Sequence, residues 1–103
     1  MSAVQARSGT GTRAPMQVRV RAKGTEMAGL DVLDLSLAGC MIHKGSWMLR
    51  EEQRVMVSLP TIANLPAMVL WVENDRAGLL FDQLLNEAVY EHLVGGYALG
   101  GGR

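Results

Sequence analysis

LDVLDLSLAGCMIHK, residues 30–44, indicates the type of fold most clearly because its pattern predicts two short strands and the turn that joins them. LDVLDLS and GCMIHK are mainly apolar, and the LAG segment between them favours a turn. Asp34 and Ser36 interrupt the apolar run and project to one side, because side chains alternate along a strand. Gly39 then permits a tight turn or the close approach of a ligand to the backbone.

Similar short strands precede and follow this pair. Apolar residues alternate with polar or basic residues from Met16 to Arg21, and later runs end at Pro60 or flank a hairpin turn at residues 75–76. Residues 22–29, with two glycines, are expected to connect the first two strands. We therefore expect about six antiparallel strands in a small barrel or sandwich, over residues 16–21, 30–36, 39–44, 54–60, 66–74 and 77–82.

The carboxyl-terminal part of the sequence predicts one helix. Asn86 is a suitable N-cap, Glu87 lies in the first turn, and Val89 and Leu93 recur at helical spacing. The glycines at 95–96 are expected to end the helix. The sequence thus divides into a flexible basic arm (1–15), one domain (16–94) and a flexible tail (95–103).

The charge of the chain is unevenly distributed. The 103 residues have zero formal net charge and are 49% hydrophobic, which suits one domain with a single core. Residues 1–25 contain five basic residues and no acidic ones, whereas the other five basic residues and all ten acidic residues follow. The amino-terminal segment is therefore where we expect an anionic ligand to bind.

Several features predict a cytoplasmic protein without membrane insertion. Cys40 is the single cysteine, which fits a reducing compartment. The amino terminus lacks the apolar segment of a signal peptide. The longest strongly apolar run, residues 67–72, is far too short to span a bilayer.

The sequence offers little support for catalysis. Cys40 and His43 are three residues apart on a strand, so they point to opposite faces and cannot share a metal or form a nucleophile pair. A nucleophile elbow, a phosphate loop and a dinucleotide fingerprint are all missing from the sequence. Five aromatic residues are too few for a platform that stacks nucleic-acid bases. We therefore predict no enzyme, no metal, no cofactor and no nucleic-acid partner.

Asp34 and Ser36 have two interpretations. A carboxylate and a hydroxyl accept hydrogen bonds from the Watson–Crick N–H groups of guanine, and arginines bind phosphates and the other guanine edge. These residues and the basic arm would then bind a guanine nucleotide. Alternatively, the Asp-x-Ser-x-x-Gly pattern is only a turn of Asx or Ser type between two strands.

The sequence resembles the PilZ domain family over about residues 7–94. DLSLAG, residues 34–39, is similar to the family's Asp/Asn-x-Ser-x-x-Gly motif, LWVENDRAGLLF to its hairpin, and LLNEAVYEHLV to its closing helix. This resemblance implies a mainly β fold, a six-stranded antiparallel barrel with a carboxyl-terminal helix. It also implies non-catalytic binding of cyclic di-GMP and control of motility, adhesion or polysaccharide output through an effector protein.

The family's second motif, Arg-x-x-x-Arg before the first strand, is incomplete. Arg13 fits its second arginine, but Gly9 occupies the position of the first, and Arg7 is the nearest substitute. REEQR, residues 50–54, has the right spacing but lies downstream, so we interpret it as surface charge. The resemblance thus implies a ligand site of Arg7, Arg13, Asp34, Ser36 and Gly39.

Two functional hypotheses follow. In the first, the domain is a cyclic di-GMP receptor in which ligand binding orders residues 5–15 and a separate effector protein is regulated. In the second, Gly9 marks a degenerate member that binds no nucleotide and serves as a protein-interaction module.

Overall fold

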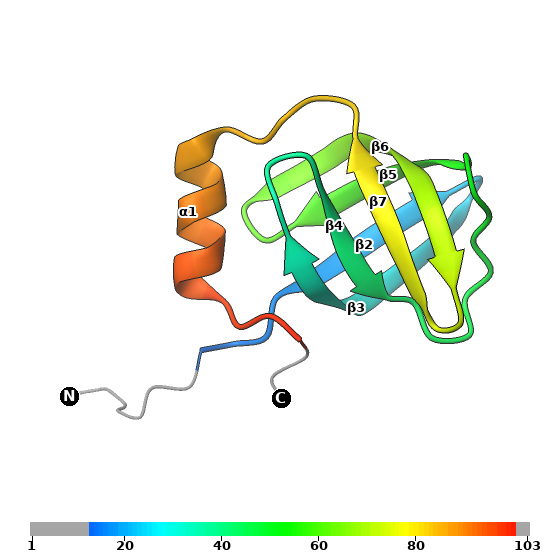
Figure 1. Ribbon diagram of the computed structural model, residues 1–103, viewed down its shortest axis with the longest axis horizontal. Helices are drawn as coiled ribbons and strands as arrows, with labels where there is room; N and C mark the ends of the chain where they lie inside the picture. The colour runs from blue at the N-terminus through cyan, green and yellow to red at the C-terminus, as the bar shows by residue number, and fades with distance from the viewer. Residues whose placement is uncertain (1–12, 101–103) are drawn as a thin grey trace.

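Six antiparallel strands and one helix make up the described part of the chain (Figure 1). The computed structural model describes residues 13–100. Figure 1 shows the helix beside one end of the barrel, and its buried Leu93 belongs to the core. The elements are β2 (Gln17–Ala22), β3 (Thr25–Leu35), β4 (Gly39–His43), β5 (Arg54–Leu59), β6 (Ile62–Glu73), β7 (Arg76–Phe81) and α1 (Glu87–Gly96).

The strands form one closed barrel in the order β2-β3-β4-β7-β6-β5. Neighbouring strands are antiparallel, and β2 pairs with β5 to complete the barrel, with Val20 opposite Val57. The predicted six-stranded antiparallel barrel with a carboxyl-terminal helix is therefore confirmed. Closure leaves none of these six strands with a free edge.

Alternation along the strands fills the barrel. In β2 the apolar residues are buried, whereas Gln17, Arg19 and Arg21 are exposed. This pattern confirms the half-buried basic strand that the sequence predicts. The largest fully buried side chains come from most strands, the helix and the start of the domain: Met16, Val20, Met27, Val32, Ile42, Val57, Val69 and Leu93.

The predicted connection over residues 22–29 is wrong. The turn contains only Lys23 and Gly24, and β3 begins at Thr25. Met27 is buried in the core, and Gly29, with φ of +70°, lies where the register between β2 and β3 shifts. Gly29 therefore belongs to an irregularity within a strand, a position that glycine often occupies, and does not end the strand.

Strand β6 begins earlier than the predicted start at residue 66. Pro66 lies inside the strand, opposite Met56 of β5. Its carbonyl oxygen accepts a hydrogen bond from the backbone N–H of Asp82 at 2.9 Å. A proline lacks only the N–H group, so its carbonyl can still hydrogen-bond from within the strand.

The hairpin turn between β6 and β7 contains Asn74 and Asp75, so the predicted turn at residues 75–76 is one position too late. Arg76 is already paired with Glu73. Asn74 has φ of +56°, a left-handed conformation that asparagine tolerates better than most residues.

Helix α1 begins as predicted. The Asn86 side chain accepts a hydrogen bond from the backbone N–H of Ala88 at 2.8 Å, which confirms Asn86 as the N-cap. Gly95 and Gly96 are its last residues. Within residues 13–100, no helix is long and apolar enough to cross a membrane.

Residues 97–100, predicted to be part of a tail, hydrogen-bond to two other segments. The backbone of Ala98 donates to Ala14 O and accepts from Met16 N, and Gly100 N donates to Val32 O. Tyr97 and Leu99 also pack against the core, and this burial explains why the chain stays beside the barrel after α1 ends. The start of the domain, its end and β3 therefore lie together.

Candidate functional site

The turn between β3 and β4 is held by the side chain of Ser36. Its Oγ accepts hydrogen bonds from the backbone N–H groups of Ala38 and Gly39, both at 3.2 Å, and donates to Gly39 O at 3.3 Å. The backbone N–H of Ser36 also donates to Gly39 O, at 2.9 Å. The interpretation of this motif as a Ser-type turn thus describes Ser36 correctly, and four hydrogen bonds within the chain hold the turn.

Gly39 is required by the neighbouring strand. A Cβ on Gly39 would lie 2.1 Å from the carbonyl oxygen of Leu79 in β7. Real Cβ atoms essentially never come so close, so any side chain here would push β4 away from β7. Gly39 therefore allows the start of β4 to lie close against β7.

Asp34 has an exposed side chain and is the next-to-last residue of β3, just before the turn. Its Oδ1 accepts a hydrogen bond from the backbone N–H of Leu35 at 3.0 Å. Across residues 13–100, no ion pair involves Asp34, and Oδ2 has no hydrogen-bond partner. This carboxylate is thus oriented by one bond and still has acceptor capacity for a ligand.

Asp34, Ser36 and Gly39 line one cavity of about 380 Å³ on the outside of the barrel. The opposite wall comes from β6 and β7, with the partly exposed Leu70, Trp71 and Leu80. The structure therefore brings the three motif residues together beside an apolar and aromatic surface. The cavity has the size and the mixed lining typical of small-molecule sites.

Trp71 is a wall residue that the sequence analysis did not identify. It lies opposite Gly78 across the β6–β7 pair, and a Cβ on Gly78 would lie 2.2 Å from its Nε1 atom. The indole therefore packs directly on the backbone of β7. The signal in the sequence is the placement of a tryptophan and a glycine at paired positions of one hairpin.

Arg13 lies at the helix and not in this cavity. Its Nη1 donates to the carbonyl oxygens of Val94 at 3.0 Å and Gly95 at 3.3 Å, at the carboxyl end of α1. These carbonyls lack helical partners and carry the negative end of the helix dipole, so a guanidinium is well placed there. Arg7 lies outside the described residues. The structure thus does not bring Arg13 together with Asp34 and Ser36.

The segment that carries Arg13 nevertheless runs close to the motif. The backbone N–H of Val32 donates to Met16 O at 2.9 Å, and Val32 precedes Asp34 by two residues on β3. Two residues of strand span about 7 Å. Arg13 and Asp34 therefore extend from two chain segments that are hydrogen-bonded to each other.

Cys40 and His43 point to opposite sides of β4, as predicted. Cys40 is buried, and this burial raises the pKa of its thiol to about 12. His43 is exposed, and its Nε2 lies 3.0 Å from Asp75 Oδ2. Desolvation raises the pKa of Asp75, but its backbone hydrogen bond and His43 outweigh this effect and lower it. In the described part of the chain, no group of three or more His, Cys, Asp or Glu side chains could hold a metal ion.

The arginines of REEQR belong to the surface. Arg54 forms a salt bridge with Asp82, and both side chains are partly exposed. The backbone N–H of Arg50 donates to Gln53 Oε1 at 3.0 Å. Neither arginine lines the cavity next to Asp34.

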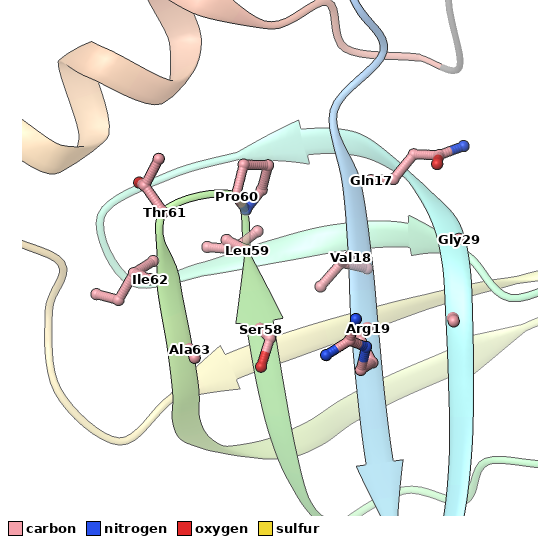
Figure 2. A pocket seen from close by; sticks show the side chains of 11 residues that line it. Gln17, Val18, Arg19, Gly29, Ser58, Leu59, Pro60, Thr61, Ile62 and Ala63 are labelled. Atoms are coloured by element: carbon pink, nitrogen blue, oxygen red, sulfur yellow. The ribbon is translucent and has the colours of Figure 1, made fainter.

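A larger cavity, of about 470 Å³, lies away from the motif between the β2–β3 pair and the β5–β6 turn (Figure 2). Most of its polar side chains already have partners. Arg19 binds Glu26 at 3.0 Å, Gln17 binds Asp31 at 3.0 Å, and Ser58 accepts from the backbone of Asn64. Its size alone therefore does not make it a better candidate than the cavity at Asp34.

The barrel, the closing helix and the polar turn beside a cavity define a small β-barrel domain with one candidate ligand site. The family model of the PilZ domain matches residues 5–98, nearly the whole chain, and the chain therefore belongs to the PilZ domain family. PilZ domains are receptors for the nucleotide cyclic di-GMP and are generally not catalytic. No curated protein and no solved structure gave a significant match.

Proposed function

We propose that this PilZ domain binds cyclic di-GMP in the cavity at Asp34 and passes the signal to a separate effector protein. The observation that carries the proposal is the Asp34 carboxylate, which is oriented by Leu35 N and retains a free oxygen beside the cavity. Such a carboxylate accepts N–H donors from the Watson–Crick edge of guanine. Because cyclic di-GMP is an intracellular messenger, we place the receptor in the cytoplasm.

The other motif residues have distinct roles in this proposal. The Oγ of Ser36 already accepts two hydrogen bonds and donates one, so Ser36 holds the turn that orients Asp34. Gly39 keeps β4 against β7. Trp71 supplies an aromatic surface next to the purine. Only Asp34 of the three motif residues would make the decisive polar contact.

Arg13, assisted by Arg7, would bind the phosphates. The guanidinium already donates charge-assisted hydrogen bonds to the Val94 and Gly95 carbonyls, but a phosphate offers a full negative charge in place of their partial charges. Exchange of the Val94 and Gly95 carbonyls for a phosphate is thus favourable. Ligand binding would then detach Arg13 from α1, and this exchange gives the effector a ligand-dependent surface to read.

Titration calorimetry of the purified chain with cyclic di-GMP tests the proposal. We expect saturable heat at micromolar protein and ligand, and strongly reduced heat for Asp34→Ala. GMP serves as the matched ligand control because it has the same base without the cyclic phosphate backbone. An absence of heat with cyclic di-GMP at these concentrations would overturn the proposal.

A second function is favoured by two observations. Gly9 stands where the family motif has an arginine, and Arg13 is engaged by α1. In this alternative the domain is a protein-interaction module without nucleotide binding. It predicts no calorimetric heat with cyclic di-GMP, together with a partner complex of the same affinity in the presence and absence of the nucleotide.

A further inference from the structure

The loop between β4 and β5 runs along the end of the barrel opposite α1 (Figure 1). It exposes two adjacent large apolar side chains, Trp47 at 42% and Met48 at 85%. Neighbouring apolar side chains with this exposure are a common mark of protein interaction sites, where tryptophan often contributes much of the binding energy.

Lys44 fixes the shape of the loop that exposes Trp47 and Met48. Lys44 is only 8% exposed, and its Nζ donates to Gly45 O at 3.1 Å and to Trp47 O at 3.0 Å. The backbone N–H groups of Lys44 and Gly45 both donate to Asp75 O. Among the described residues, no carboxylate pairs with Lys44. A buried ammonium is costly unless it is hydrogen-bonded, so its donors hold the loop in this shape.

One depression adjoins the exposed pair, and a second shares Lys23 of the β2–β3 turn with it. The first, about 300 Å³, lies between this turn and the loop, and Trp47 and Met48 form one side of it. The second, about 240 Å³, combines Arg21, Lys23 and Arg54 with the apolar Met56 and Pro66. The recess beside Trp47 and Met48 and the basic recess therefore meet at Lys23.

Within residues 13–100, part of this positive charge lacks a counter-ion. Among these residues, Arg54 pairs with Asp82, but Arg21 reaches only the neutral Asn64 Oδ1, at 3.4 Å. Glu26 lies opposite Arg21 across the strand pair, yet its carboxylate binds Arg19 at 3.0 Å. In the described chain, the Lys23 side chain has no hydrogen-bond or ion-pair partner. Arg21 and Lys23 are thus available to carboxylates of a partner.

We propose that Arg21, Lys23, Trp47 and Met48 form a docking surface, here named the distal surface, for an acidic segment of another protein. A bulky apolar side chain of that segment enters the recess beside Trp47 and Met48, and flanking carboxylates bind Arg21 and Lys23. This inference goes beyond nucleotide binding, because no residue of the distal surface lines the cavity at Asp34.

Peptide selection on the intact protein tests the distal surface. Short random peptides are displayed and selected on the full chain, and the affinity of each selected peptide is measured by fluorescence anisotropy. We expect acidic residues around a Trp, Phe or Leu, and a loss of affinity of about tenfold or more for Lys23→Glu and for Met48→Asp. Both positions are exposed, so thermal unfolding should be nearly unchanged in these variants.

Asp34→Ala is the matched control and should bind the selected peptides like the wild type, whether or not the chain binds cyclic di-GMP. The proposal is overturned by a failure to select binders, by peptides without acidic residues, or by equal affinity for all variants. It is also overturned if sedimentation shows a wild-type dimer that Met48→Asp dissociates, because the distal surface would then be an interface between two copies of this chain.

Discussion

The β3–β4 turn and the segment around Arg13 carry the two halves of the proposed nucleotide site, and they differ in how they are held. The turn is stabilised by its own atoms, through the four hydrogen bonds between Ser36 and the residues after it. Arg13 is held by α1, a different element, through two hydrogen bonds on the surface. One half is therefore preformed, whereas the other half must leave an existing partner.

The two halves of the proposed nucleotide site therefore differ in the free-energy cost of binding the ligand. A preformed turn loses little conformational freedom when ligand binds, which favours affinity. Arg13 first breaks its contacts with Val94 and Gly95, so its net contribution is the difference between two sets of hydrogen bonds. Changes in the turn should thus have larger effects than changes at Arg13.

The largest effect is expected for Gly39→Ala. The new Cβ would lie 2.1 Å from Leu79 O, and both partners are backbone atoms that cannot move without separating β4 from β7. We expect a loss of about 3 kcal/mol in the free energy of unfolding, measured by urea denaturation. Gly95→Ala is the matched control: its Cβ meets nothing within 4 Å, and alanine in a helix should raise stability by about 0.5–1 kcal/mol. Equal stability of the two variants would contradict this account of Gly39.

Asp34→Ala should weaken the binding of cyclic di-GMP without unfolding the turn. Loss of a charge-assisted contact is worth about 2 kcal/mol, or about thirtyfold in Kd, measured by calorimetry. Asp31→Ala removes another carboxylate of β3, one that hydrogen-bonds to Gln17 and does not line the cavity, and should leave the affinity unchanged. If Asp34→Ala instead lowers the thermal midpoint strongly and leaves the Kd unaltered, Asp34 has a structural role only.

Gly9→Arg completes the Arg-x-x-x-Arg spacing with Arg13 and tests how much the basic arm contributes to the affinity for cyclic di-GMP. A second guanidinium on the phosphates should tighten binding by about tenfold, or about 1.4 kcal/mol. Gly11→Arg adds the same charge at the wrong spacing and should give a smaller gain, through general attraction alone. Equal gains from the two variants would show that spacing does not matter and that the arm contributes only its charge.

The sequence predicted the fold well within strands whose residues alternate between buried and exposed, and less well at strand ends. Alternation located β2 because each residue faces either the core or the solvent, and the run that ends at Pro60 located β5. The starts of β3 and β6 were misplaced because Gly29 and Pro66 normally interrupt strands. Here Gly29 lies at a shift in register, and Pro66 stays in its strand because its carbonyl oxygen accepts a hydrogen bond.

The same distinction applies to the site. Asp34, Ser36 and Gly39 are adjacent in sequence, so their shared turn was predictable from local rules. The place of Trp71 depends on the register of β6 against β7, which shifts just before it. The bonds of Arg13 to Val94 and Gly95 join residues 81 and 82 positions apart, and no local pattern indicates such a contact.

Arg13→Ala should have the smallest effect on the free protein and a larger one on the complex. Without ligand, loss of the exposed contacts at the end of α1 should cost about 0.5 kcal/mol in the free energy of unfolding. With saturating cyclic di-GMP, the loss should grow by about 1–2 kcal/mol, because the wild-type arginine then binds phosphate and tighter binding adds to stability. Urea denaturation with and without ligand measures both values. Arg13→Lys keeps the charge but not the planar fork, so its stability with ligand should lie between those of the wild type and Arg13→Ala. The same loss in both states would mean that Arg13 remains on the helix in the complex, and the exchange from helix to phosphate would be wrong.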